Sequence, residues 1–324
     1  MKEIIVRQAV PRNASRLVEM KQHISPVLKT MVKYRWLYLM AVPPLAYFVI
    51  FHYLPLWNAQ IAFKNFKPLL GVWQSPWIGF QHFITFFKSF YFTQLISNTV
   101  IISMLKLVFG IPLAIVLALA LYETSFKRFQ VLVQTSAYLP HFLSWVIMLG
   151  VLLMMLSPAD GLINAVIKSM GGKPIAFLTS PDWFRTVVVF SDIWKETGWA
   201  TILYLAALMG IDTTLYEAAQ VDGANRLQRI WHISLPGIMP VIVILTMLRL
   251  GHILNAGFNQ IFVLYSLPVY SVGDIIDTWV YRSGILDFQL SLATAVGLFK
   301  GVIGLVLILV ANRVAKKVAG STLY

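Results

Sequence analysis

The chain contains no cysteine among its 324 residues, and it has little charge. Without cysteine it can form neither a disulfide nor a thiolate metal site. Only 12% of the residues are Asp, Glu, Lys or Arg, whereas 58% are hydrophobic. Soluble domains carry about 25% charged residues, so this chain has too little polar surface to cover a water-soluble globule. We expect the excess apolar surface to face lipid.

Two signatures of catalysis are also missing. The phosphate-binding pattern G-x-x-x-x-G-K-[ST] does not occur, because the only Gly-Lys pair, at Gly172, has Ile167 in place of the first glycine and Pro174 in place of the hydroxyl residue. The six histidines are scattered without the spacing of metal ligands. We therefore predict that the chain is not an enzyme and holds no cofactor or metal.

Long apolar runs are what the chain has in abundance. A helix needs about 20 residues to cross a hydrocarbon core of about 30 Å. Six segments approach this length and predict an all-α, polytopic membrane protein with six transmembrane helices: residues 36–53, 96–122, 131–156, 187–209, 238–254 and 292–313. The first contains Pro43 and Pro44, which a membrane helix tolerates when neighbouring groups satisfy the freed carbonyls.

The basic residues orient these helices. The net charge of +13 would suggest nucleic acid in a soluble protein, but here it indicates topology. With a cytoplasmic N-terminus, 15 Lys and Arg lie on the cytoplasmic side and six lie outside. We expect a multi-pass protein of the bacterial cytoplasmic (inner) membrane with both termini inside. Its parts would be a basic segment 1–35, a permease domain 36–314 and a tail 315–324.

The first outer loop, residues 54–95, is crowded with aromatic side chains. Rings at this depth usually form a belt at the membrane interface, which is the interpretation that composition favours. The alternative is a docking surface for an external protein, shared with a second predicted outer loop, residues 258–290, and involving Trp73, Trp77, Asp274 and Asp277.

The segment between the fourth and fifth apolar runs predicts a helical elbow. Leu215–Ala219 is a good helix former, and it follows Asp212, which with the next threonine offers a cap. Gly223 would stop or bend this helix. A second short helix then leads to Pro236 at the start of the next span. We expect this elbow, residues 212–237, to project into the cytoplasm.

The order of residues in the elbow carries a family resemblance. Glu217-Ala218-Ala219 is followed after three residues by Gly223 and, nine residues later, by Ile233-x-Leu235-Pro236. This resembles the EAA loop of permease subunits of binding-protein-dependent ABC importers. Residues 194–199, 277–284 and 293–300 resemble the carbohydrate-importing branch, most closely permeases for oligosaccharides of complex polysaccharides such as alginate.

The resemblance implies a type I ABC importer permease fold whose short helix around Glu217–Arg229 is a coupling helix. It also implies an ATP-binding subunit dimer that holds ATP and Mg, a periplasmic solute-binding protein and a second permease, which we expect to be a paralogue. The predicted ATPase-coupling residues are Glu217, Ala218, Ala219, Asp222, Gly223, Arg226 and Pro236.

Charged residues inside spans are costly and are site candidates by default. The cations in or beside spans exceed Asp192 and Glu196 by two in the middle and outer halves, which favours an acidic, uronate-type oligosaccharide over a neutral one. The alternative is that these charges form structural ion pairs or find carboxylates on the partner permease. The predicted substrate-pathway residues are Lys106, Trp194, Lys195, Glu196, Trp199, Arg249, His252, Asn255 and Lys300.

Two other classes of protein fit less well. A secondary transporter would show inverted repeats and matching broken helices, and the two halves of this chain show no convincing similarity to each other. A membrane enzyme would need an acid–base or nucleophilic constellation, which the sequence does not offer.

Overall fold

The computed structural model describes residues 30–319, and that part of the chain is helical throughout its regular structure. Within it no strand forms, and a single isolated bridge joins Lys64 to Trp77. The all-α prediction is confirmed. Most of the predicted basic segment 1–35 and the end of the tail lie outside the described residues. The chain divides into two compact units, one ending at Gln60 and the other beginning at Ile61.

The first unit contains the first predicted span. Helix α2 (Arg35–Phe48) continues through Pro43 and Pro44 into a π-helical turn (Val49–Tyr53) and α3 (Leu54–Leu56). A 3-10 helix (Trp57–Phe63) crosses the boundary between the units. The helical stretch from Arg35 to Phe63 is 29 residues long and apolar enough to span a membrane. The proline pair is tolerated, as expected.

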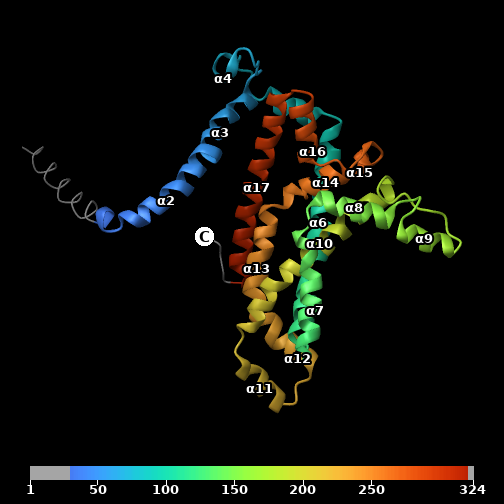
Figure 1. Cartoon of the computed structure of the whole chain (residues 1–324). Coiled ribbons are helices and arrows are strands. Elements are labelled where there is room, and N and C mark those ends of the chain that lie inside the picture. Colours follow the sequence, from blue (N-terminus) through green and yellow to red (C-terminus); the bar gives the residue numbers. More distant parts are fainter. Residues whose placement is uncertain (1–29, 320–324) are drawn as a thin grey trace, which may run out of the picture. The chain divides into compact units, whose positions relative to one another are not determined.

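The second unit contains the remaining helices (Figure 1). In chain order they are α4 (Gly71–Gln74), α5 (Gln81–Lys88), α6 (Tyr91–Tyr122), α7 (Lys127–Tyr138), η3 (Leu139–Phe142), α8 (Trp145–Leu156), α9 (Leu162–Ser169), α10 (Pro181–Met209), α11 (Thr213–Val221), α12 (Arg226–Arg229), η4 (Ile230–Ser234), α13 (Leu235–Gly251), η5 (Ile253–Asn255), α14 (Phe258–Leu264), η6 (Leu267–Val269), α15 (Tyr270–Gly273), α16 (Ile276–Tyr281), η7 (Arg282–Leu286) and α17 (Leu290–Ala319).

The span count depends on how bent helices are treated. Four helices of the described chain are long and apolar enough to cross a membrane. Six spans result if each of two bent pairs counts as one, namely the helical stretch 127–142 with α8 and helix α10 with α11. Those six follow the order of the six predicted segments. The outer segment 258–290, predicted as a loop, instead contains α14, α15, α16 and a π-helical turn.

Helices α6 and α10 pack along each other at the centre of this unit. Buried positions on both helices recur every three or four residues, which places them on one face of a helix with 3.6 residues per turn. On α6 they include Leu95, Asn98, Ile102, Lys106, Gly110, Ala114, Ala118 and Leu121. On α10 they include Phe184, Val188, Ser191, Lys195, Gly198, Thr201, Leu205 and Leu208.

The third predicted span, 131–156, is wrong as a single straight helix. The helical stretch 127–142 and α8 meet at a bend of 111°. Pro140 has no N–H to continue a helical ladder. Ser144 starts a new helix by accepting a hydrogen bond from the N–H of Ile147. Uninterrupted hydropathy across the bend hid these two local signals.

The fifth predicted span, 238–254, also differs at both ends. Pro236 stands in the first turn of α13, as expected, but the helical stretch already begins at Arg226 and continues through a π-helical turn to Gly251. The chain then unwinds, and Ala256 and Gly257 take left-handed conformations with φ of 46° and 84°. The unwound backbone lies beside α6, whose Ser103 donates a hydrogen bond to the carbonyl of Ile253.

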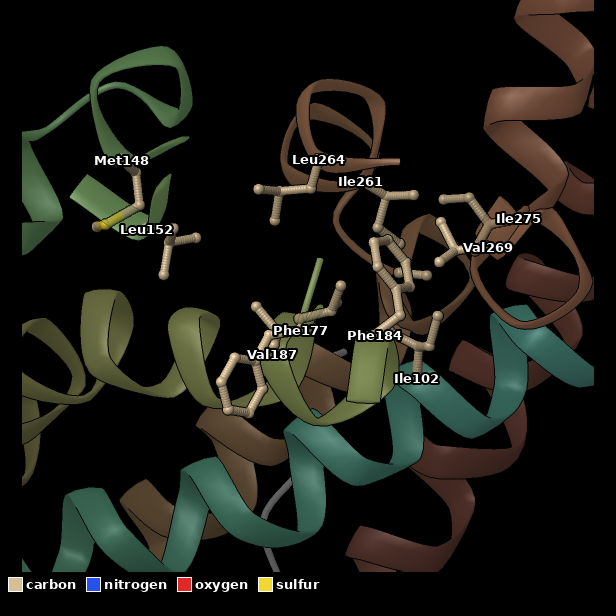
Figure 2. Packing of buried hydrophobic residues seen from close by; sticks show 12 residues of the cluster. Ile102, Met148, Leu152, Phe177, Phe184, Val187, Ile261, Leu264, Val269 and Ile275 are labelled. Atoms are coloured by element: carbon tan, nitrogen blue, oxygen red, sulfur yellow. The ribbon is translucent and has the colours of Figure 1, made fainter. Parts of the chain in front are cut away.

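A hydrophobic cluster joins the bent third span to the rest of the unit. Figure 2 shows Met148 and Leu152 facing Leu264, with Phe184 of α10 close to Ile261 and Ile275. Because the cluster draws on α6, α8, α10, α14 and the segment before α16, it holds α8 in its bent position. Figure 1 places the elbow α11–α12 at the opposite end of this unit from α15 and α16.

Candidate functional site

The elbow is built by local signals. Asp212 caps α11 by accepting a hydrogen bond of 2.9 Å from the backbone N–H of Thr214. This hydrogen bond lowers the pKa of Asp212 below its ordinary value. Gly223 turns the chain with φ of +79°. Asn225 then caps α12 in a reciprocal capping box with Gln228. The predicted cap, turn and second helix are all present.

One contact closes the elbow on itself, and two fasten it to the bundle. The hydroxyl of Tyr216 lies 3.0 Å from Oγ of buried Ser234. The rings of Tyr122 and Tyr216 lie 5.9 Å apart. Nη2 of Arg229 lies 3.8 Å from a carboxylate oxygen of Glu123, directly after α6. The elbow is thus attached to the end of the central helix α6.

The predicted coupling residues lie mainly on the outer surface of the elbow. Ala219 is half-buried, and the other six are exposed: Glu217, Ala218, Asp222, Gly223, Arg226 and Pro236. Within the described chain Glu217 has no side-chain hydrogen bond or ion pair. A cavity of about 380 Å³ lies inside the bend, lined by Asp222, Gly223 and Arg229 among others.

A second group of predicted residues surrounds a cavity between α6, α10 and the unwound segment after α13. This central cavity has a volume of about 280 Å³. Its lining combines cations, carboxylates and backbone from the broken fifth span: Ser103, Lys106, Leu107, Asp192, Glu196, Arg249, His252, Ile253, Ala256 and Gly257. Four predicted pathway residues therefore meet here, namely Lys106, Glu196, Arg249 and His252.

Lys106 is buried and fully engaged within the chain. Its Nζ lies 3.0 Å from Oδ1 of Asp192 and donates to the carbonyl of Ala256 at 3.1 Å. It also donates to Oε1 of Gln260, whose amide donates in turn to the carbonyl of Val188 and to Ser191. Lys106 thereby ties α10 and the unwound fifth span to α6, which is a structural role.

Lys195 and Glu196 contact the break in the third span. Nζ of Lys195 donates to the carbonyl of His141 and lies 3.5 Å from that of Pro140. A carboxylate oxygen of Glu196 lies 2.9 Å from Nδ1 of His141. The ring of His141 stacks on Trp199 at 4.7 Å with an interplanar angle of 4°. Lys195 is buried, whereas Glu196 reaches the central cavity.

Arg249 and His252 join the central cavity to a second one. This lower cavity, also about 280 Å³, is more apolar and is lined by Trp199, Ala200, Leu203, Tyr204, Leu245, Leu248, Arg249 and His252. Nδ1 of His252 lies 3.0 Å from the carbonyl of Leu248. Lys195 has a carboxylate partner, since its Nζ lies 3.7 Å from an oxygen of Glu196. Within the described chain, Arg249 is therefore the in-span cation of the predicted set for which no carboxylate partner is found.

Three predicted pathway residues lie elsewhere. Trp194 and Asn255 are exposed and line neither cavity. Nζ of Lys300 binds both carboxylate oxygens of Asp277 at 2.6 Å. This ion pair borders a separate cavity of about 610 Å³ between α16 and α17, which Asp277 helps to line.

Two expectations about charge are corrected by these contacts. The excess of two cations falls to one, because α16 supplies Asp277 from a segment that was predicted to be an outer loop. Asp274 is buried and paired with Arg282 at 2.5 Å, so it is not available to an external protein. Trp73 and Trp77 remain 71% and 64% exposed.

Sequence reasoning missed three residues of these sites: His141, Gln260 and Asp277. Asp277 and Gln260 are polar residues in or beside apolar segments, and each would have signalled a buried partner. His141 lies next to Pro140, and the break that this proline indicates gives the histidine its position. In the described part of the chain, no cluster of three or more His, Asp or Glu residues could hold a metal ion.

A bundle of apolar helices with a projecting helical elbow and a polar cavity between broken spans defines the class: a membrane component of a transport system. The model of the family "binding-protein-dependent transport system inner membrane component" matches residues 110–320. The chain belongs to this family and has the type I ABC importer permease fold.

Two relatives and one solved structure are similar over most of their length. The chain is 47% identical to protein LplB of Bacillus subtilis, covering 87% of this chain and 89% of LplB. It is 42% identical to the polygalacturonan/rhamnogalacturonan transport system permease protein YteP of Bacillus subtilis, covering 94% and 95%. A bacterial ABC transporter involved in the import of the acidic polysaccharide alginate aligns with a TM-score of 0.85 and 43% identity, covering 91% and 99%.

Proposed function

We propose that this chain is the permease subunit through which an ATP-driven importer passes an oligosaccharide into the cytoplasm. The family membership supports a membrane component that receives solute from a binding protein. YteP, by its name, transports polygalacturonan or rhamnogalacturonan, and the aligned transporter imports alginate. The full sequence lacks a phosphate-binding loop. A separate ATP-binding subunit dimer therefore supplies ATP, Mg and hydrolysis, and a second, paralogous permease completes the pathway.

The elbow is the proposed contact with the ATPase. Its exposed face combines Glu217 with large apolar side chains, since Val221 is 88% and Leu227 67% exposed. A charged group and apolar surface without internal partners are typical of a protein interface. Glu217 would pair with a basic group of the ATPase, and Gly223 supplies the turn that shapes the contact. In this proposal both termini and the elbow are cytoplasmic, as the distribution of Lys and Arg predicts.

We further propose an acidic, uronate-type oligosaccharide as the substrate. The observation that carries this proposal is Arg249, a cation without a carboxylate partner in the described chain, placed where two cavities meet. An unpaired cation in such a site costs several kcal/mol unless an anion shares it. A guanidinium can hold a carboxylate through two parallel hydrogen bonds. Trp199 offers a flat apolar surface for the sugar ring beside it.

A neutral oligosaccharide is the second candidate, and one observation favours it. The lining of the central cavity contains two carboxylates, Asp192 and Glu196, for its two permanent cations, Lys106 and Arg249. Such a balanced wall provides hydrogen bonds to hydroxyl groups without selecting a charge. The two candidates differ in what Arg249 contributes.

The deciding experiment is ATP hydrolysis by the complete complex in lipid, stimulated by binding protein loaded with chain-length-matched acidic or neutral oligosaccharides. We expect acidic oligosaccharides to stimulate hydrolysis more strongly. Equal stimulation by neutral sugars would favour the second candidate. No stimulation by any oligosaccharide would contradict sugar import itself.

A further inference from the structure

The break in the third span is fixed by one helical stretch of α10. Lys195, Glu196 and Trp199 lie within five residues, and all three contact the break at residues 139–145. Gly198 belongs to the same stretch, and any side chain there would collide with the carbonyl of Ala137. Together with His141, the three α10 residues form a set that we call the latch: His141, Lys195, Glu196 and Trp199.

Lys195 holds both sides of the break. A helix end leaves carbonyl groups without intrahelical partners. The buried ammonium of Lys195 donates to the carbonyl of His141 and lies 3.5 Å from that of Pro140, which also accepts from the N–H of Leu143. It also lies 5.7 Å from the ring centre of Trp145, the first residue of α8. An ammonium group has three donors and no acceptor, which suits it to this position. Lys195 is therefore the fixed part of the latch.

The contacts of His141 differ from those of Lys195, because they are made by residues that also line cavities. Glu196 lines the central cavity and binds one edge of the imidazole. Trp199 lines the lower cavity and covers one face of the imidazole. The side chains of His141 and Glu196 are 28% and 31% exposed. This half of the latch is therefore within reach of a solute in the cavities.

We propose that the latch reports the occupancy of the cavities to the break in the third span. A sugar hydroxyl in the central cavity would compete with His141 for the carboxylate of Glu196, and a sugar ring would compete for the surface of Trp199. A ligand shifts a conformational equilibrium only when its contacts differ between the two states. Glu196 supplies that difference, since it binds His141 when the cavity is empty and the sugar when it is filled.

The consequence is a change in the angle between α7 and α8. Lys195 keeps the break in place, while release of His141 frees residues 139–144 to rearrange. Because α8 packs on α14 through Met148, Leu152 and Leu264 (Figure 2), movement at the break would reach the segment that follows the unwound fifth span. His141 is thus a positioning residue for transport. The inference rests on the proposed function, because it needs an oligosaccharide in the cavities.

Two substitutions separate the contacts of the imidazole. His141→Phe keeps a ring for Trp199 but removes the hydrogen bond to Glu196. His141→Gln keeps a polar partner for Glu196 but removes the ring. His52→Gln in the first span is the matched control, since it changes a histidine outside the latch. We would measure ATP hydrolysis with and without loaded binding protein, together with hydrogen exchange at residues 139–147.

In the wild type, we expect substrate to increase hydrogen exchange at the break. In His141→Phe, exchange should be raised already without substrate. The ratio of stimulated to basal hydrolysis should fall by about tenfold, the scale of one charge-assisted hydrogen bond. His141→Gln should fall between this variant and the wild type, and His52→Gln should match the wild type. If His141→Phe does not assemble, Glu196→Gln takes its place, with a smaller fall expected.

The outcomes separate the latch from the proposed function. If the wild type responds to an oligosaccharide, and the His141 and Glu196 variants respond equally with unchanged exchange, the latch is overturned and sugar import stands. If no oligosaccharide stimulates the wild type, the proposed function is contradicted and the latch loses its role with it.

Discussion

The elbow and the central cavity differ in where the partners of their polar groups lie. In the elbow, the exposed Glu217 has no partner in the described chain, and the capping groups Asp212 and Asn225 bind backbone two and three residues away. At the cavity, Lys106 is held by Gln260, 154 residues distant. Beside it, Lys195 binds the carbonyl of His141, 54 residues distant. An outward-facing surface without partners suits a contact with another protein. A wall satisfied internally holds helices in place and leaves few groups for a solute.

The strongest test of the elbow is its turn. Gly223 has φ of +79°, a conformation that a β-branched side chain takes only under strain. We expect Gly223→Val to insert in the membrane but to abolish substrate-stimulated ATP hydrolysis. Gly223→Asn, which tolerates the left-handed conformation, should retain most of it. Normal stimulation in Gly223→Val would show that the shape of the elbow does not carry coupling.

Because Lys106 of the cavity is paired within the chain, we expect its substitution to lower the stability of the protein. Removing one partner of a buried pair leaves an uncompensated charge and costs about 3–5 kcal/mol. Lys106→Met should therefore lower the thermal unfolding temperature of the complex in detergent, and Lys106→Met with Asp192→Leu should recover much of the loss. If the single variant were as stable as the wild type and only transport changed, Lys106 would belong to the substrate and not to the scaffold.

Arg249 resembles Glu217 of the elbow, because its charge has no oppositely charged partner in the described chain. We therefore expect it to contribute to substrate binding and little to stability. Arg249→Gln should leave the unfolding temperature nearly unchanged. It should weaken the interaction with acidic oligosaccharides, measured from the concentration needed to stimulate ATP hydrolysis, by about 1.5–3 kcal/mol, the range for a hydrogen bond to a charged group. Neutral oligosaccharides serve as the internal control. An equal loss with both sugars would remove the argument for a carboxylate.

The smallest expected effect concerns the cap of α11. The hydrogen bond from Thr214 lowers the pKa of Asp212 in the folded protein. The contribution of this cap to the local stability of the elbow is therefore full above the unfolded pKa of about 3.9. It is lost as the pH falls through the lower pKa of the folded state. Asp212→Ala should increase hydrogen exchange in α11 at neutral pH. Asp212→Asn should keep the cap and lose the dependence on acid. Equal exchange in all three would mean that Asp212 does not hold the helix.

The sequence predicted the local contacts of the elbow better than the long-range contacts around the cavities. The elbow was predicted in detail because its signals, Asp212 and Gly223, act within a few residues. Apolar length gave the order of the spans, but it concealed the bend at Pro140, where an unbroken hydrophobic run crosses two helices. A structural ion pair was an alternative for the charges inside spans, but Asp277 as the partner of Lys300 depends on how α16 packs against α17, in a segment that was predicted to be an outer loop.

The central claim is that the elbow, and not the opposite end of the bundle, meets a separate ATPase. The absence of native cysteine makes this directly measurable, because an introduced cysteine is the only one in the chain. Glu217→Cys and Leu69→Cys, the latter at a fully exposed position in the segment before α4, would each be crosslinked in the complete complex. We expect crosslinks from position 217 to the ATP-binding subunit and none from position 69. Crosslinks to that subunit from position 69 alone would contradict it.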